Sequence, residues 1–399
     1  MAEIPTIDLE AHASEPLSYG GELDGYTVVD TDAHFLAPAK DLVEYMDEPW
    51  RTRASQVIPD VWREASAREA RTSDGRLGRI RRAAYGGLSA ILPGTTGDRQ
   101  QWGKVIREHS AYPDAAQEVS KLPDAMEFLG VDTSIQISHF MLNAAGVGAD
   151  DGRIPTFFRA YTQYMIEEVL DPDRGIYGFV PLPQDHVDLA VEMLSWVEDH
   201  EGLVGGVMLT AGAVPPLGNR KYDPIYELAE DLDVPLALHT SGSGLDSLQG
   251  FGSFLETHTL GFMQNNQSQL VSMVFQGVPE RYPDLDVVFV ESGVAYLPAL
   301  GARMDEEWLK RTEEAPLLEK RPSEYLREDF YYTSQPLETA AGTAHLEHCF
   351  EFVGDRLMYA SDYPHWDFDR PTTITNLPFL SRAEKQRILA GNAQEVFGV

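Results

Sequence analysis

Four residues of types that bind divalent metal ions stand at the ends of short apolar runs in the sequence. Asp32 and His34 come near the end of VVDTDAHF. His239 ends VPLALH, and Asp362 ends RLMYASD. Each residue alone is more typical of a structural role, such as a loop histidine that is hydrogen-bonded to a carboxylate. Together, two imidazoles and two carboxylates suit Zn²⁺ or Mn²⁺, and they predict a site for one such ion.

The place of these residues in their runs indicates where they meet. Side chains two apart on a strand point to the same face, so Asp30, Asp32 and His34 share one side of the first run. Apolar residues precede the polar ones in each run, which places the polar residues at the C-terminal ends of strands. In barrels of alternating strands and helices, the active site lies at these ends. A cation would also relieve the cost of burying a carboxylate at Asp362.

The elements that must position these residues are eight short apolar runs, most of them followed by a segment with helical periodicity. Strands that are apolar on both faces and separated by helices favour a closed parallel barrel over an open doubly wound sheet. No Gly-x-Gly-x-x-Gly turn follows the first run, which argues against a dinucleotide-binding fold. The sequence therefore predicts an α/β fold, a (β/α)8 TIM barrel. The eight runs span residues 26–35, 131–140, 175–183, 202–211, 234–241, 285–292, 329–334 and 356–365.

A single barrel domain over residues 1–399 accommodates all eight runs. Amphipathic segments at 187–200, 224–232 and 345–354 are predicted helices of its outer ring. Residues 40–126 form an arginine-rich, mostly helical insertion after the first strand. Because this insertion leaves the C-terminal end of that strand, we expect it to lie near the active-site mouth.

The charge of the chain narrows the range of partners. The 399 residues are 43% hydrophobic, which is enough for a large core, and 64 acidic residues against 31 basic ones give a net charge of −33. Such a field repels nucleic-acid phosphates and anionic lipid head groups, so neither nucleic acid nor membrane is an expected partner. The spread of acidic residues resembles haloarchaeal composition and predicts adaptation to high salt, the alternative being an ordinary acidic cytosolic enzyme.

The cysteine count and the hydropathy pattern bear on location. Cys349 is the only cysteine, which excludes an intrachain disulfide and a zinc site of the Cys-cluster type. No uninterrupted apolar stretch approaches the roughly 18 residues that span a bilayer. The sequence therefore predicts a cytoplasmic protein, which we expect to be a homo-oligomer, most simply a dimer, acting on a small-molecule substrate.

Longer motifs resemble the amidohydrolase-related family that includes aminocarboxymuconate-semialdehyde decarboxylase and related aromatic-acid decarboxylases. The resemblance is strongest in VVDTDAHFLAP, ALHTSGSG, GVPERYPDLDVVFVESGVAYLPALGARMDEEW and LMYASDYPH, and it is weakest over residues 40–126. It covers nearly the whole barrel. These motifs are specific for the superfamily but not for a substrate.

The resemblance implies roles for individual residues. The family's metal ligands are His-x-His or Glu-x-His on strand 1, a His ending strand 5 and an Asp ending strand 8. By resemblance they fall on the pair Asp32 and His34, on His239 and on Asp362. Asp32 departs from the pattern, because its carboxylate replaces the first His or Glu. This substitution makes Mn²⁺ plausible beside Zn²⁺.

Three further residues near the predicted site have open roles. Where many family members carry a proton-transferring His on strand 6, this chain has Glu291, which would act in acid–base chemistry or, alternatively, orient a neighbour or pair with Arg303. His258 lies in the long segment after strand 5 and could enter the pocket to contact the substrate or a metal ligand. His365 follows Asp362 by three residues and could fix the loop after strand 8.

The same site supports two reactions. In decarboxylation, the metal would hold the substrate carboxylate and an adjacent oxygen, Asp362 would provide a proton to carbon, and Glu291 or a water molecule would relay it. In hydrolysis of an ester, lactone, amide or thioester, Asp362 would accept a proton from water. The carboxylate-x-His pair on strand 1 resembles the pattern of the family's decarboxylases, so we favour a carboxy-lyase acting on a small aromatic or enoic acid. A metal-dependent hydrolase is the alternative, and a metal-binding protein without catalysis is a remote one.

Overall fold

The computed structural model describes residues 23, 25–35, 37, 39–53, 118–138, 153–240, 254–338, 342–365 and 368–399. Within this part of the chain, eight parallel strands pair in sequence order, each with the next. All eight fall inside the predicted runs. The strands are β1 (Val29–Phe35), β2 (Thr133–Ser138), β3 (Ile176–Pro181), β4 (Leu203–Leu209), β5 (Leu236–His239), β6 (Val287–Val290), β7 (Tyr331–Thr333) and β8 (Leu357–Met358).

The sheet closes between β1 and the residues that follow β8. Ala33 forms a parallel bridge with Tyr363. The backbone N–H of His34 donates to the carbonyl of Tyr363 at 2.9 Å, and the N–H of Asp362 donates to the carbonyl of Asp32 at 2.7 Å. These contacts join the first strand to the last, and the predicted (β/α)8 barrel is confirmed.

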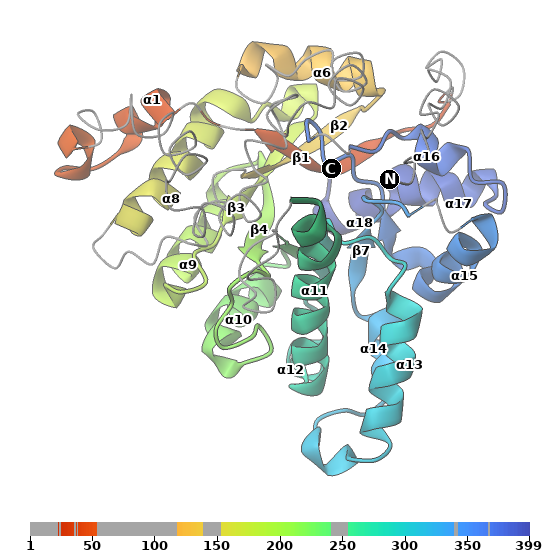
Figure 1. Ribbon diagram of the computed structural model, residues 1–399. Helices are drawn as coiled ribbons and strands as arrows, with labels where there is room; N and C mark the ends of the chain where they lie inside the picture. The colour runs from red at the N-terminus through yellow and green to blue at the C-terminus, as the bar shows by residue number, and fades with distance from the viewer. Residues whose placement is uncertain are drawn as a thin grey trace, which may run out of the picture.

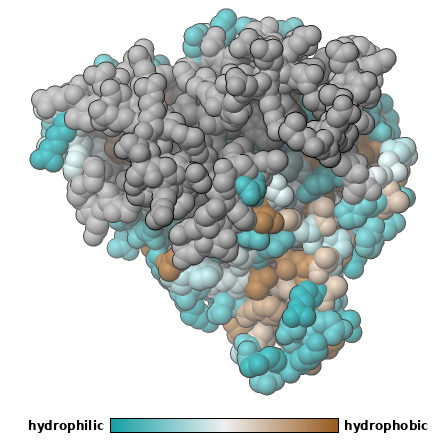
Figure 2. All heavy atoms as spheres, in the orientation of Figure 1, coloured by the Kyte–Doolittle hydropathy of each residue, from teal (hydrophilic) through white to brown (hydrophobic). Residues whose placement is uncertain are grey.

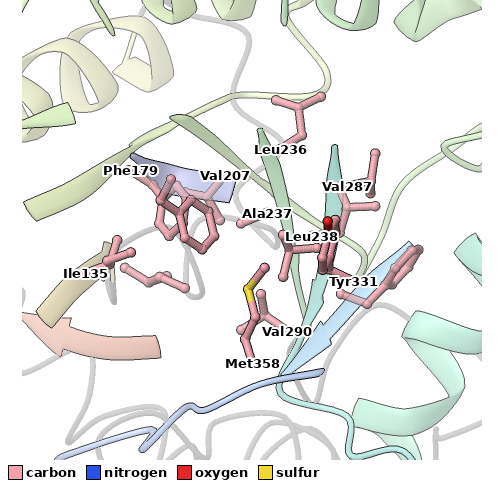
Figure 3. Packing of buried hydrophobic residues seen from close by; sticks show 14 of the residues in the cluster. Ile135, Phe179, Val207, Leu236, Ala237, Leu238, Val287, Val290, Tyr331 and Met358 are labelled. Carbon is pink, nitrogen blue, oxygen red and sulfur yellow. The ribbon is translucent and has the colours of Figure 1, made fainter. Parts of the chain in front are cut away.

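Both faces of the sheet are buried, as a parallel barrel surrounded by helices requires. Every residue of β1, β4, β5 and β6 is buried. Each fully buried Val, Leu, Ile, Phe or Met side chain contributes about 1.5–3 kcal/mol to folding. This core holds the strand ends in fixed positions. Figure 3 shows core side chains from successive strands, among them Ile135, Phe179, Val207, Leu238, Val290 and Met358.

The helices surround the strands (Figure 1). The three predicted helices are confirmed as α9, α10 and α15. The longer helices are α6 (Leu122–Leu129), α8 (Arg153–Tyr164), α9 (Val187–Leu194), α10 (Asp223–Asp231), α11 (Phe254–Phe275), α13 (Leu297–Trp308), α14 (Pro322–Glu328) and α15 (Thr343–Val353). The shorter ones are α1 (Ala39–Leu42), α12 (Val278–Arg281), α16 (Thr372–Thr375), α17 (Arg382–Gln386) and α18 (Asn392–Phe397).

Helix α11 is attached to two strand ends through buried amides. Asn266 Nδ2 donates to the carbonyl of Val290 at 2.9 Å and to Ser292 Oγ at 2.8 Å. Gln269 Nε2 donates to the carbonyl of Thr210 at 2.9 Å. The segment after strand 5 is thus a helix that fixes the loops after β6 and β4.

The predicted insertion at 40–126 is described only at its two ends, which contain α1 and most of α6. Residues 54–117 lie outside the described residues. Its place near the active-site mouth stays a prediction, as does a single domain over the whole chain.

On the described part of the face that Figure 2 shows, hydrophilic residues are common around the edge, and hydrophobic residues gather in the middle of the lower half. Large apolar side chains exposed on the described residues are Val214, Leu309 and Leu317. Among the helices that the structure describes, none is both long and apolar enough to cross a membrane.

Candidate metal centre

The structure brings together the four residues that the sequence selects as ligands. His34 Nε2 lies 2.9 Å from Asp362 Oδ1 and 3.3 Å from Asp32 Oδ1. His239 Nε2 lies 3.5 Å from Asp32 Oδ1. Ligand atoms bound to one ion at the usual Zn–N and Zn–O lengths are about 3–3.5 Å apart. All four residues are at most 2% exposed, so the cluster is buried.

The backbone places each candidate ligand at a strand end. Asp32 and His34 lie on β1, His239 is the last residue of β5, and Asp362 follows β8. Asp362 has a φ of 62°, in the left-handed region that non-glycine residues rarely adopt. The barrel closure already described fixes this backbone directly against Asp32. Strained backbone of this kind concentrates at functional sites.

Backbone carbonyls orient the rings of the two histidines. Nδ1 of His34 faces the carbonyl oxygen of Ile137 at 3.3 Å, and Nδ1 of His239 faces that of Thr240 at 2.5 Å. A carbonyl oxygen only accepts, so Nδ1 donates in both contacts. Nε2 of each ring faces the cluster, where an ion would take its lone pair. Ligand histidines in metalloproteins are held in this way.

The donor set fits a cation. Within the part of the chain that the structure describes, neither carboxylate oxygen of Asp32 nor Nε2 of His239 has a hydrogen-bond partner. The cluster thus concentrates imidazole lone pairs and carboxylate oxygens in a buried space, an arrangement that is repulsive on its own. A divalent ion bound by nitrogen and oxygen converts this repulsion into attraction.

A third histidine reaches the same cluster. His365 Nδ1 lies 2.5 Å from Asp362 Oδ1, and its ring centroid is 4.4 Å from that of His34. His34, Asp362 and His365 could therefore form a second ligand group beside Asp32, His34 and His239. Both groups contain His34, whose Nδ1 faces the carbonyl oxygen of Ile137, so Nε2 is the one atom of this ring that could bind an ion. The geometry therefore supports a single metal site.

Glu291 lies beside the cluster, directly after β6. Its backbone has a φ of 57°, and its N–H donates to Thr333 Oγ1 at 3.1 Å. The side chain is almost fully buried, and Oε2 lies 3.4 Å from His239 Nε2. The alternative partner Arg303 instead pairs with Glu307 at 3.0 Å on the surface. Glu291 is therefore close enough to act on the same substrate as the cluster.

Gln335 is a site residue that the sequence analysis missed. It is fully buried just after β7, and its Nε2 donates to Asp362 Oδ2 at 3.3 Å. The signal was present in the sequence, because Gln335 is a polar residue beyond the end of a predicted strand. It was overlooked because an amide is neither a preferred metal ligand nor an acid–base group.

Asp30 connects β1 to the residues that follow β8. Its carboxylate accepts hydrogen bonds from the backbone N–H and the hydroxyl of Ser361, at 2.8 and 2.5 Å, and from the N–H of Asp32 at 3.2 Å. Complete burial raises the pKa of Asp30 to about 7, although these hydrogen bonds lower it. Asp30 therefore links β1 to the residue before Asp362.

His258 lies in the first turns of α11 and is partly buried. Its ring is tilted against that of Phe262, with centroids 4.4 Å apart. Thr240 Oγ1 donates to the carbonyl of Phe262 at 2.9 Å, which keeps this part of the helix near the end of β5. The structure thus places His258 on an element next to the site, and its contact with a substrate stays a prediction.

Two sequence relatives are similar to this chain over most of their length. Gamma-resorcylate decarboxylase from Polaromonas sp. (strain JS666 / ATCC BAA-500) is 24% identical over 298 residues, which cover 72% of this chain and 90% of the relative. Gamma-resorcylate decarboxylase from Rhizobium sp. (strain MTP-10005) is 25% identical over 329 residues, 74% of this chain and 98% of the relative.

Solved structures share the fold. An amidohydrolase from Mycobacterium avium subsp. paratuberculosis K-10 matches with a TM-score of 0.68 at 19% identity, over 94% of this chain and all of the other. A 5-carboxyvanillate decarboxylase from Novosphingobium aromaticivorans DSM 12444, complexed with manganese and a nitrobenzoic acid, matches with a TM-score of 0.63 at 18% identity, over 95% and 97% of the two chains. The family profile described as Amidohydrolase matches residues 29–399, which include every strand of the barrel. The chain belongs to the amidohydrolase family.

Proposed function

We propose that the protein is a metal-dependent carboxy-lyase that removes CO₂ from a small aromatic carboxylic acid. The observation that carries the proposal is the buried set of lone pairs on Asp32, His34, His239 and Asp362, with a further carboxylate, Glu291, next to it. The sequence relatives named as gamma-resorcylate decarboxylases support the same reaction type.

Asp32, His34, His239 and Asp362 would hold one divalent ion, Mn²⁺ or Zn²⁺. Related decarboxylases crystallised with bound manganese favour Mn²⁺. When bound, the ion supplies positive charge that holds the carboxylate and a neighbouring oxygen of the substrate. The chain's own residues must then move a proton and exclude water.

Asp362 and Glu291 are the groups proposed to handle the proton. A proton is added to the ring carbon that carries the carboxylate, the bond from this carbon to the carboxylate then breaks, and its electron pair restores the conjugated ring as CO₂ leaves. Asp362 delivers the proton, and Glu291 relays its replacement. His258 is a third candidate for contact with the substrate, because it lies on the helix next to the end of β5.

The experiment offers Mn²⁺-loaded and Zn²⁺-loaded protein a panel of hydroxylated benzoic acids together with aromatic esters. We expect release of CO₂ and, in D₂O, one deuterium on the carbon that carried the carboxylate. His239→Ala should abolish turnover and lower bound metal well below one ion per chain, whereas His348→Ala, at an exposed position on α15, should change neither. Uptake of ¹⁸O from water into the product without CO₂ would instead establish the hydrolase.

We also propose that the protein is cytoplasmic and forms a homodimer, and that residues 40–126 border the active-site mouth within one barrel domain. The charge and the hydropathy pattern of the sequence support the location. Light scattering of the purified chain tests the dimer, and a mass near 44.4 kDa would exclude it.

A further inference from the structure

We propose that His365 is a positioning residue, which fixes the carboxylate of Asp362 through its Nδ1–H. The inference rests on the proposed function, in which Asp362 both binds the ion and handles a proton. It assigns His365 a task beyond fixing a loop.

A tight turn brings the two residues together. The backbone N–H of His365 donates to the carbonyl of Asp362 at 2.9 Å, which closes a four-residue turn. Across this turn, Nδ1 lies 2.5 Å from Oδ1 of the carboxylate. An ionised carboxylate only accepts, so Nδ1 carries the proton. At 6% exposure the hydrogen bond is shielded from water, which strengthens it.

The carboxylate of Asp362 is held on both sides. Oδ1 faces His34 Nε2 at 2.9 Å as well as His365, and Oδ2 accepts from Gln335 Nε2 at 3.3 Å. Rotation of the carboxylate about its Cβ–Cγ bond would break both sets of contacts. The contact with Gln335 is long for a hydrogen bond and the contact with His365 is short, so donation from His365 helps to keep Oδ1 turned toward His34.

His365 also supports the neighbouring ligand. Its ring packs against that of His34, with an angle of 44° between the planes. Nδ1 is already engaged as a donor to Asp362, so this nitrogen has no lone pair for a metal. His365 could bind a metal only through Nε2, and the asparagine variant described below distinguishes that role from donation to Asp362.

Three substitutions separate hydrogen bonding from packing. His365→Phe keeps a ring against His34 but removes the donor. In His365→Asn, the amide nitrogen is separated from Cα by the same number of bonds as Nδ1 of histidine. In His365→Gln, it is separated from Cα by the same number of bonds as Nε2. His348→Phe, at the exposed position on α15, serves as the matched control. The measurements are the dissociation constant for Mn²⁺, by titration of metal-free protein, and kcat and KM of the Mn²⁺-loaded enzyme.

We expect His365→Phe to weaken Mn²⁺ binding and to lower kcat, each by about 10–100-fold, the usual effect of removing a partner of a metal ligand. KM should change by less than about threefold, because His365 is proposed to act through Asp362 rather than on the substrate. His365→Asn should return both quantities to within about threefold of the wild type, and His365→Gln should behave like His365→Phe.

Wild-type Mn²⁺ affinity and kcat in His365→Phe would overturn the proposal. So would a His365→Asn variant as impaired as His365→Phe, which would indicate direct ligation, or equal rescue by asparagine and glutamine, which would indicate packing. If His365→Phe does not fold, as judged by circular dichroism, the asparagine and glutamine variants decide. The Mn²⁺ titration requires no substrate, so failure of the proposed decarboxylation is a separate result.

Discussion

Replacing Asp32 with asparagine should have opposite effects on the metal-free and the metal-loaded protein. In the metal-free protein, the buried carboxylate faces Nε2 of His34 and of His239, and no hydrogen bond among the described residues compensates it. An asparagine amide can donate to Nε2 of His239, which has no hydrogen-bond partner among these residues. Asp32→Asn should therefore stabilise the protein without metal and destabilise it with metal.

The magnitudes follow from the burial of the site and the size of the chain. A buried polar group without a partner costs about 1–3 kcal/mol, and more when it is charged. Unfolding entropy of about 2.1 cal/mol/K per residue gives the 399-residue chain about 0.8 kcal/mol per degree. The metal-free variant should therefore melt about 1–4 °C higher than the wild type. Free Mn²⁺ at 100 times its dissociation constant stabilises the wild type by about 2.7 kcal/mol, or about 3 °C.

The assay is thermal melting at pH 8, where a free imidazole is neutral, in chelator and in excess Mn²⁺. The control is Asp284→Asn, which removes one negative charge at an exposed position. Its change in melting temperature measures the general relief of charge repulsion and is subtracted from that of Asp32→Asn. Asp32→Asn should melt at a higher temperature than the wild type in chelator and at a lower temperature in excess Mn²⁺. A variant that melts below the wild type in chelator, after this correction, would refute the view that Asp32 is uncompensated without an ion.

Three other predictions concern acid–base chemistry, pH and salt. Glu291→Gln should keep bound metal but cut turnover by about 10²–10⁴, measured at saturating substrate, and an unchanged kcat would make the residue structural. Burial raises the pKa of Glu338 from 4.5 to about 7. The folded state then holds this proton more tightly than the unfolded chain, so stability falls as pH rises from about 4.5 to 7, by at most about 3 kcal/mol. Urea denaturation of wild type and Glu338→Gln at pH 5 and pH 7.5 should show a smaller loss in the variant, and equal losses would contradict the burial argument. The net charge of −33 predicts a melting temperature that rises from tens of millimolar to molar KCl, and a flat or falling curve would exclude salt adaptation.

The barrel and its main cluster could be predicted because their signals are local. Each strand is a short apolar run, and the candidate ligands lie at or just beyond the ends of these strands. Once the strands close into a barrel, their C-terminal ends converge whatever the loops do. Asp32, His34, His239 and Asp362 could thus be selected before any distance was known.

The surroundings of the cluster depend on geometry that no local pattern specifies. The contact of His365 with Asp362 requires one particular turn, and the contact of Gln335 requires a particular rotamer beyond β7. Sequence spacing does not show which way a side chain leaves a strand end, so the sequence alone does not distinguish a neighbour from Arg303 as the partner of Glu291. Here it is directed toward His239 by a left-handed backbone.

The closure of the barrel has a consequence for the order in which the chain can assemble. His34 and Asp362 are 328 positions apart in the sequence, yet their side chains touch. During synthesis, β1 emerges long before the residues that follow β8, so Asp32 and His34 are made long before Asp362. Contacts so distant in sequence form late and slowly, because a long loop must close first. The complete set of candidate ligands therefore forms only in the last steps of folding. We expect a chain that has bound its ion to have a closed barrel.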